Sequence, residues 1–249
     1  MRRDTDPSGA ERLTDLKYPR VLLKLSGEAL AGEKGFAFDF EIIKRLADEV
    51  ASVVGAGASV GLVIGGGNII RGRALSEEGI DRVTADYMGM LGTVINAMAV
   101  QDVLERKGLD TRVMTAIRME EVAEPYIRRR ALRHLEKGRI VIFAAGTGNP
   151  YFSTDTAAVL RAIQMKANVI IKATSVDGVY SADPKRDPNA TFYDEISFRD
   201  VMLKNLGVID QTAITLCSEN HLPLIVLNIH RPGLFVAAVR GERVGTLVR

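Results

Sequence analysis

The sequence predicts an α/β fold, a three-layer αβα sandwich built around a mainly parallel central sheet. Two observations support this prediction. Short apolar runs rich in β-branched residues alternate along the chain with patterns of helical period. Most of these runs are apolar throughout and do not alternate with polar residues, as is typical of parallel strands that are covered on both faces.

Six runs are expected to form the strands of this sheet. In chain order they are Arg20–Leu25, Ser59–Ile64, Thr111–Thr115, Arg139–Ala144, Asn168–Lys172 and Leu224–Asn228. In open α/β sheets, ligands gather beyond the carboxyl ends of such strands. The residues that follow each run are therefore where a functional site is expected.

Helix signals fill the stretches between the strands. Asp39 can cap a helix that ends near Gly55 or Gly57, and its apolar face consists of Ile43, Leu46, Ala47, Val50 and Val54. A long helical run, Asp81–Lys107, and a shorter one, Arg128–Lys137, are each followed by a glycine. Three further helices are expected from Ser153 to about Ala167, after a capping box at Ser197–Asp200, and over Asp210–Asn220.

Length and composition fit one folded domain. The chain has 249 residues, 47% of them hydrophobic and 26% charged, with a formal net charge of +2. This charge balance argues against a wide nucleic-acid-binding surface. The single cysteine, Cys217, favours a reducing compartment, and no secretory signal or stretch of bilayer length is present, so a cytoplasmic protein without membrane contact is expected. Residues 1–18 are polar and expected to form a mobile tail before a domain over 19–249.

A glycine turn follows the second strand. Gly65, Gly66 and Gly67 lie between the apolar run and Asn68, so the backbone can turn sharply and direct several N–H groups at a phosphate. The alternative is a simple strand-to-helix turn. The Walker and dinucleotide-binding spacings are both absent, because Ile70 and its neighbours stand where those motifs need Gly-Lys or a third Gly. Phosphate binding would have to use another arrangement.

Two lysines lie at the carboxyl ends of apolar strands. Lys24 is followed by Ser26 and Gly27, and Lys172 by Ala173 and Thr174. A lysine in an apolar run is costly unless it meets an anion, which could be a bound phosphate or a neighbouring carboxylate. Two such lysines suit phosphoryl transfer, where charge on the migrating group must be stabilised.

The loop after the fourth strand, residues 145–155, mixes turn residues, hydroxyls, an amide and two aromatic rings. Such a loop can contact a phosphate, a ribose and a base in one sweep. Asp155 falls in the first turn of the next helix, where a carboxylate also stabilises the helix itself. Both roles remain open for this residue.

Five motifs occur in an order and spacing that resemble one known family. They are Lys24-Leu25-Ser26-Gly27-Glu28, Gly65-Gly66-Gly67-Asn68 with Arg71-Gly72, Asp86-Tyr87-Met88-Gly89-Met90, Gly146-Thr147-Gly148-Asn149-Pro150, and Lys172-Ala173-Thr174 with Val176-Asp177-Gly178-Val179-Tyr180. Together they resemble the bacterial-type UMP (uridylate) kinases of the amino acid kinase superfamily, over residues 19 to 249. The resemblance implies an amino acid kinase-like fold with an acceptor-binding lobe, about residues 19–166, and an ATP-binding lobe, about 167–249.

The resemblance also implies an activity: transfer of the γ-phosphoryl group of ATP to UMP in pyrimidine nucleotide biosynthesis. Mg²⁺ would be carried by the nucleotide phosphates, with no metal ligand from the protein. Lys24 and Lys172 would stabilise the transferring group, and Asp155 would position them. ATP would be bound by Lys24, Leu25, Ser26, Gly27, Gly67, Arg71, Thr174, Tyr180 and Asp183. UMP would be bound by Gly66, Asp86, Thr147, Gly148, Asn149, Pro150, Tyr151, Phe152, Ser153 and Thr154, with Asp86 on the ribose.

Regulation and assembly are implied in the same way. The family suggests a homohexamer, activation by GTP and inhibition by UTP, and the segment implied for GTP activation consists of Gly32, Glu33, Lys34, Gly35, Phe36 and Ala37. The long run Asp81–Lys107 contains small residues, Gly89, Gly92 and Ala97, that could pack against a partner subunit or inside the domain.

Two alternatives to this activity remain at the level of sequence. One is a related kinase with another acceptor, such as aspartate, acetylglutamate, carbamate or isopentenyl phosphate. The other is a non-catalytic nucleotide- or oxyanion-binding protein on the same fold. Asp86 and the loop Thr147–Thr154 favour UMP, since a small acid needs fewer contacts, and the presence of both lysines with Asp155 favours catalysis.

Overall fold

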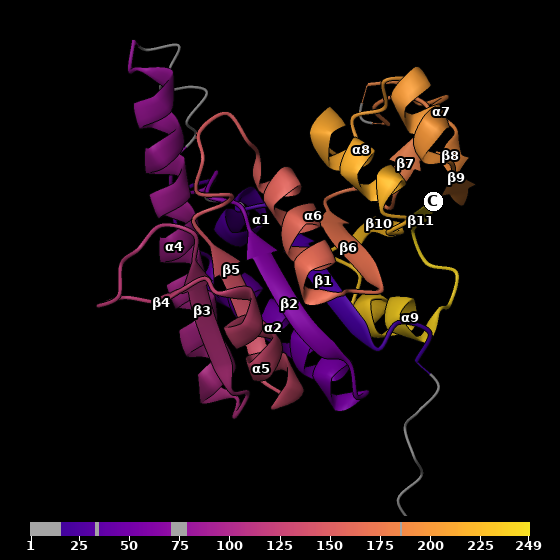
Figure 1. Ribbon diagram of the computed structural model, residues 1–249. Helices are drawn as coiled ribbons and strands as arrows, with labels where there is room; N and C mark the ends of the chain where they lie inside the picture. Colours follow the sequence, from indigo (N-terminus) through magenta and orange to yellow (C-terminus); the bar gives the residue numbers. More distant parts are fainter. Residues whose placement is uncertain (1–15, 33–34, 71–78, 185) are drawn as a thin grey trace, which may run out of the picture.

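The computed structural model describes residues 16–32, 35–70, 79–184 and 186–249 and confirms the predicted fold class (Figure 1). Its main sheet within these ranges has nine strands with helices on both faces. In sheet order the strands are β4 (Glu124–Pro125), β3 (Thr111–Thr115), β5 (Ile140–Ala144), β2 (Ser59–Ile64), β1 (Arg20–Leu25), β6 (Val169–Thr174), β10 (Leu224–Asn228), β11 (Thr246–Val248) and β9 (Glu195–Ile196).

The sheet is parallel from β4 to β10, and its direction changes at the edge beyond. There β11 pairs antiparallel with β10, and β9 pairs parallel with β11. A small separate sheet joins β7 (Val179–Tyr180) to β8 (Phe192–Tyr193). None of these short strands was expected, because two- or three-residue strands leave no periodic pattern to read.

Four of the six predicted strands have the expected bounds, and two are shifted. Arg139 lies outside β5, because its N–H is bonded to the His134 carbonyl at the end of the preceding helix. β6 begins after Asn168 and continues past Lys172 to Thr174, which pairs with Asn228 of β10. The longer ladder brings Thr174 to the carboxyl edge of the sheet.

Helices cover both faces of the sheet. One face is covered by α1 (Glu28–Ala31), α2 (Phe40–Gly55), α4 (Arg82–Arg106) and α9 (Leu234–Arg240), and the other by α5 (Arg128–Glu136), α6 (Thr154–Met165), α7 (Phe198–Leu203) and α8 (Gln211–Glu219). Alternation along β1 divides the core, since Leu23 and Leu25 belong to the first face and Leu22 to the second. No helix in the described ranges is long and apolar enough to cross a bilayer.

Side-chain caps start several of the predicted helices. Asp39 accepts hydrogen bonds from the N–H groups of Glu41 and Ile42 at the start of α2. Ser153 caps α6 by accepting from Asp155 N and Thr156 N, as expected. These caps satisfy amides that have no partner within the helix, so they fix the residue at which each helix begins.

Two of the three small residues of α4 pack inside the domain. A Cβ atom on Gly66 would lie 2.6 Å from the Gly89 carbonyl oxygen, and one on Gly92 would lie 3.3 Å from the Gly66 oxygen. Ala97 is fully buried in the core. Gly92 and Ala97 therefore pack inside the domain, and Gly92 lets α4 approach the glycine turn. A Cβ on Gly89 would meet nothing within 4 Å, so its contact with a partner subunit stays a prediction.

The packed part of the chain includes residues assigned to the polar tail. Tyr18 is buried and donates its N–H to the carbonyl oxygen of Val239 in α9, at 3.1 Å. Leu16 packs against the same core. Residues 1–15 of the expected tail lie outside the described residues.

Candidate active site

The two strand-end lysines are direct neighbours across the sheet. β1 and β6 pair in parallel with Lys24 opposite Lys172. Side chains alternate between the two faces along a strand, so Lys24 lies on the same face as Leu22, and Lys172 on the same face as Ile170. This face is covered by the layer that contains α6. The register thus places two ammonium groups side by side beneath the N-terminus of α6.

A single carboxylate bridges these lysines. Lys24 Nζ lies 2.6 Å from Asp155 Oδ1, and Lys172 Nζ lies 2.8 Å from Asp155 Oδ2. The three side chains are only 9–15% exposed. Lys172 also donates to the Val208 carbonyl oxygen at 2.6 Å. The carboxylate partner considered for Lys24 is thus the residue implied to position both lysines.

Burial and charge compete within this ionic centre. Burial would raise the pKa of Asp155, but the charges of Lys24 and Lys172 outweigh it, so the net pKa is lowered. For Lys172, burial lowers the pKa, aided by repulsion from Lys24 and opposed by Asp155. The lysines thus favour the ionised carboxylate, whereas burial and Lys24 disfavour the charged form of Lys172.

Asp210 joins the N-termini of α6 and α8 beside this centre. Its carboxylate accepts hydrogen bonds from the hydroxyls of Ser153 and Thr156 and caps α8 through Ala213 N. Sequence reasoning placed Asp210 only at the start of a helix, because the hydroxyls it binds are more than fifty positions away. It is a residue of the site that was missed.

Cys217 lies on α8 within the same layer. Burial raises the pKa of its thiol to about 12, and the nearby carboxylates of Asp155 and Asp210 act in the same direction. The thiol is therefore neutral and unreactive at physiological pH.

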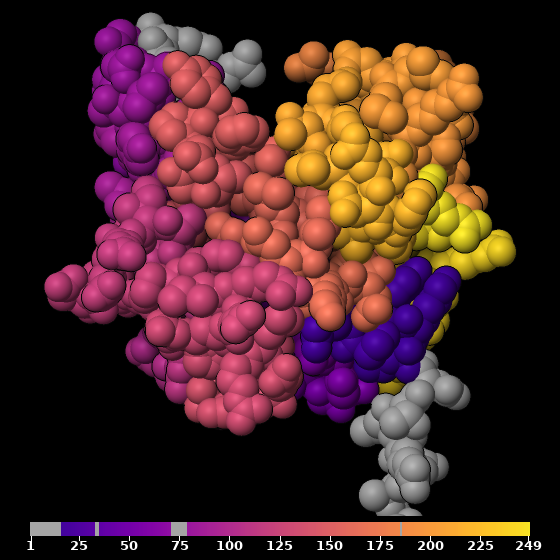
Figure 2. Space-filling view, in the orientation of Figure 1, coloured from indigo at the N-terminus to yellow at the C-terminus, as the bar shows by residue number. Residues whose placement is uncertain are grey.

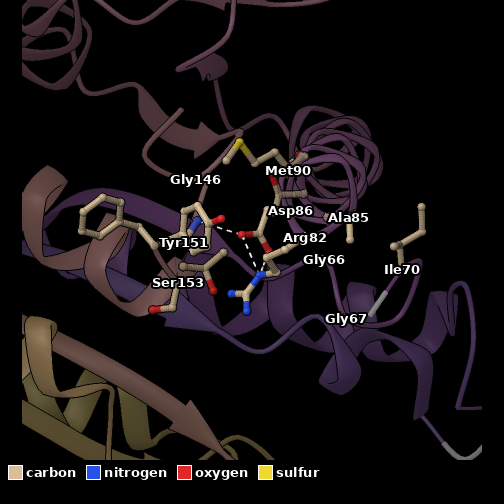
Figure 3. Close-up of a pocket in the computed structure, with 14 residues that line it drawn as sticks. Gly66, Gly67, Ile70, Arg82, Ala85, Asp86, Met90, Gly146, Tyr151 and Ser153 are labelled. Atoms are coloured by element: carbon tan, nitrogen blue, oxygen red, sulfur yellow. Dashed lines mark hydrogen bonds and ion pairs between the residues drawn. The ribbon is translucent and has the colours of Figure 1, made fainter. Parts of the chain in front are cut away.

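One pocket lies on the α4 side of the ionic centre. It has a volume of about 290 Å³ and is closed by α4, the glycine turn and the loop before α6 (Figure 3). Among the residues implied for UMP, it is lined by Gly66, Asp86, Tyr151, Phe152, Ser153 and Thr154. We call it the acceptor-side pocket. Gly67, implied for ATP, also lines it.

The other four residues implied for UMP do not line this pocket. They are Thr147, Gly148, Asn149 and Pro150. Thr147 Oγ1 donates to the Asn149 carbonyl and accepts from Asn149 N, which forms a local turn. A Cβ on Gly148 would lie 3.2 Å from Ala116, so this turn packs on the segment after β3. Their part in binding stays a prediction.

A second pocket, of about 450 Å³, lies beyond the carboxyl end of β6. We call it the donor-side pocket. It brings together Thr174, Tyr180 and Asp183, the three residues implied for adenosine. Its other wall, Lys204–Val208 after α7, was missed, because an irregular turn of ordinary composition gives no motif. Tyr180 is held there by an edge-to-face contact with Phe192 at 5.3 Å.

The remaining residues implied for ATP surround the glycine turn. Leu25 is fully buried, so only its backbone is available there, and its carbonyl oxygen accepts from Gly65 N. Gly27, next to Ser26, must lack a side chain, since its Cβ would lie 2.4 Å from the Gly65 oxygen. Arg71 lies outside the described residues.

Two buried side-chain amides, those of Asn96 and Asn68, hold the glycine turn in place. Asn96 of α4 donates to the Gly65 carbonyl oxygen at 2.6 Å and to Asn68 Oδ1 at 2.7 Å. Asn68 donates in turn to the Ala37 carbonyl oxygen. Asn96 was not identified from the sequence, since an asparagine in the middle of a long helix resembles any other polar position.

The segment implied for GTP activation ends at this support. Gly32 has a left-handed φ of 57° after α1, and Phe36 is exposed. Glu33 and Lys34 lie outside the described residues, and Gly35 has open space around it. Ala37 donates its N–H to the Asn68 carbonyl oxygen. The segment therefore touches the glycine turn through Asn68, and its effector role stays a prediction.

The two pockets flank the ionic centre. Ser153 and Thr154 line the acceptor-side pocket and immediately precede Asp155, while Val208 lines the donor-side pocket and accepts from Lys172. The space-filling view shows the molecule notched at the top between its pink and orange segments (Figure 2). Two bound anions could therefore approach the same pair of lysines from opposite sides.

Comparison with known proteins agrees with this arrangement. The chain is similar to the crystal structure of UMP kinase from Bacillus anthracis, with a TM-score of 0.91 and 46% identity over 93% of this chain and 96% of that one. UMP kinase from Ureaplasma parvum gives 0.88 and 37% over 94% and 99%, and uridylate kinase from Archaeoglobus fulgidus gives 0.72 and 32% over 92% and 99%. The model of the amino acid kinase family matches residues 19–228. The chain belongs to the amino acid kinase family.

Proposed function

We propose that this protein is a UMP kinase that transfers the γ-phosphoryl group of ATP reversibly to UMP, giving ADP and UDP. The observation that carries the proposal is the buried Lys24–Asp155–Lys172 centre between two pockets. One pocket is assigned to each nucleotide. The names of the three similar structures support UMP as the acceptor.

The proposed step is an in-line transfer. A phosphate oxygen of UMP forms a bond to the γ-phosphorus of ATP while the bond from that phosphorus to the β,γ-bridging oxygen breaks. The electron pair of the broken bond leaves with ADP, and the UMP phosphate, ionised at neutral pH, needs no base. Lys24 and Lys172 stabilise the charge on the migrating group and on the leaving oxygen. Asp155 touches no reacting atom and holds the two ammonium groups in place.

Each pocket contributes recognition of one nucleotide. On the acceptor side, Asp86 would accept from the UMP ribose and the glycine turn would approach the phosphates. On the donor side, Thr174, Tyr180 and Asp183 would contact adenosine. The division into an acceptor lobe, about 19–166, and an ATP lobe, about 167–249, follows the position of the pockets.

Mg²⁺ would enter with the nucleotide phosphates. Asp155 lies against two lysines, and their charge disfavours a dication bound directly to this carboxylate. Phosphate oxygens are preferred Mg²⁺ ligands, and the ion neutralises charge that develops between the β- and γ-phosphates. We therefore assign no protein residue as its direct ligand.

A homo-oligomer is proposed from the outer face of α4. Tyr87, Leu91, Ile95 and Met98 recur at helical spacing along it and are 42–50% exposed. An apolar stripe of this length is typical of an interface between subunits. The hexameric state, activation by GTP, inhibition by UTP and a cytoplasmic location are predictions carried by the resemblance.

An acceptor panel tests this function. The purified protein is incubated with Mg-ATP and each of UMP, CMP, aspartate, acetylglutamate, carbamate and isopentenyl phosphate, while ADP formation is followed. We expect UMP to give the highest rate by a wide margin. If ADP formed only with another acceptor, that acceptor would replace UMP as the assigned substrate. If no acceptor gave ADP, the kinase assignment would be contradicted.

A further inference from the structure

Asp86, the carboxylate assigned to the ribose of UMP, is also held by two neighbouring residues of the protein. It lies on α4 at the wall of the acceptor-side pocket, and Arg82 Nε, one turn earlier, lies 3.0 Å from each of its oxygens. Its Oδ2 also accepts from Tyr151 N at 2.7 Å, which ties α4 to the loop before α6 (Figure 3). The carboxylate thus joins two walls of the pocket.

These contacts limit what Asp86 can offer a ligand. A carboxylate has about four lone-pair sites, two on each oxygen. Tyr151 N and Arg82 Nε occupy Oδ2, and Arg82 Nε also lies on Oδ1. Because the single N–H of Arg82 Nε is shared between the two oxygens, Oδ1 keeps the larger free acceptor capacity and is the oxygen that can accept from a ligand hydroxyl.

Arg82 also contacts the loop directly. Its guanidinium carbon lies 5.5 Å from the centre of the Tyr151 ring, within the range of a cation–π contact. Tyr151 has a φ of 70°, a left-handed value that is strained for a tyrosine, and its side chain is exposed. The contacts to Asp86 and Arg82 help to hold this backbone.

We propose that Arg82 is a positioning residue that determines acceptor specificity. By fixing the rotamer of Asp86 and the loop at Tyr151, it leaves one carboxylate oxygen directed at one ribose hydroxyl of the acceptor. Discrimination between UMP and a deoxy analogue then depends on Arg82, which also lines the acceptor-side pocket and acts in this proposal through Asp86 and Tyr151. The inference rests on the proposed function, because it explains how the ribose of UMP is recognised.

The test compares Arg82→Ala with wild type on UMP, dUMP and 3′-deoxy-UMP at saturating Mg-ATP. Wild type is expected to prefer UMP over at least one deoxy analogue by about 10-fold or more in kcat/KM, the value of a hydrogen bond to a charged group. Arg82→Ala is expected to raise KM for UMP about 10-fold, leave KM for ATP unchanged and largely abolish that preference. Arg82→Lys, which retains the charge but not the planar guanidinium, should fall between them.

The control is Arg106→Ala, which removes a second ion pair of the same spacing, to Asp102, at the far end of α4. It should leave kcat/KM for all three acceptors at the wild-type values. Equal losses of kcat/KM on UMP and both analogues in Arg82→Ala would overturn the inference, as would an unchanged KM for UMP. A wild-type protein without UMP-dependent ADP formation would instead refute the proposed function itself.

Discussion

Asp155 and Asp86 are both carboxylates held by cations, yet the cations that hold them differ in burial and in where they come from along the chain. Asp155 lies between Lys24 and Lys172, all three 9–15% exposed, and it depends on the register of β1 against β6. Asp86 is held by Arg82, which is 46% exposed and one helical turn away. The two lysines on Asp155 are buried and come from two strands, whereas the arginine on Asp86 comes from the same helix and is half exposed.

The difference separates chemistry from recognition. Charges buried away from water interact strongly and need no rearrangement when charge develops on a substrate. A solvent-exposed pair contributes at most about 1 kcal/mol to stability, so its value must lie in geometry. Substitutions at the two sites should therefore differ in kind: those at Asp155 should alter stability and turnover, and those at Arg82 should alter acceptor choice.

The largest effect on stability is expected from Asp155→Ala. Removing the carboxylate that bridges them leaves two buried ammonium groups side by side, which should lower the free energy of unfolding by about 3–5 kcal/mol. Urea denaturation monitored by circular dichroism measures it. Asp102→Ala, at an exposed pair on α4, is the control and should cost less than about 1 kcal/mol. Equal changes for the two variants would mean that burial of the ionic centre is unimportant.

A smaller loss is expected from Asn96→Ala. The variant leaves the buried Gly65 carbonyl oxygen and Asn68 without their partner, which should cost about 1–3 kcal/mol. Because the amide supports the glycine turn, KM for the nucleotides should rise as well. Gln101→Ala, on the same helix but away from the pockets, serves as the control. A destabilised Asn96→Ala with unchanged KM values would show that the amide pair supports only the fold.

The pH dependence of stability provides the smallest and most specific test. The folded-state pKa of Asp155 is lowered by the lysines, so its contribution to stability is complete above the unfolded value, near 3.8. It is lost as the pH falls from that value through the lower folded-state pKa, about 1.4 kcal/mol for each unit of depression. Urea denaturation between neutral pH and pH 3 should therefore show a steeper loss for wild type than for Asp155→Asn. Parallel curves would contradict the assigned shift.

Local patterns in the sequence predicted much of this molecule. Caps such as Asp39 and Ser153 and the apolar runs of the long strands depend on neighbouring residues, so their elements were placed within a few positions. The strand-end position of Lys24 and Lys172 was enough to suggest an anion site. The resemblance then grouped Thr174, Tyr180 and Asp183, which the structure brings to one pocket.

What the sequence did not reveal depends on contacts between distant residues. Asp210 acts on hydroxyls of another helix, and Asn96 reaches Gly65 across the face of the sheet. The short strands β7 to β9 exist only because partners lie beside them. Gly89 and Gly92 were ambiguous for the same reason, since a small residue does not indicate which surface approaches it.

The central claim is that phosphoryl transfer takes place at the lysine pair between the two pockets. Its most direct test is a single-turnover measurement with γ-labelled ATP, following the label into UDP for wild type and Lys172→Met with both nucleotides saturating. We expect Lys172→Met to bind both nucleotides with dissociation constants close to those of wild type but to transfer the label about 100–1,000-fold more slowly. Lys137→Met, an exposed position at the end of α5, should transfer it at the wild-type rate. A Lys172→Met protein that transfers the label as fast as wild type would contradict the claim.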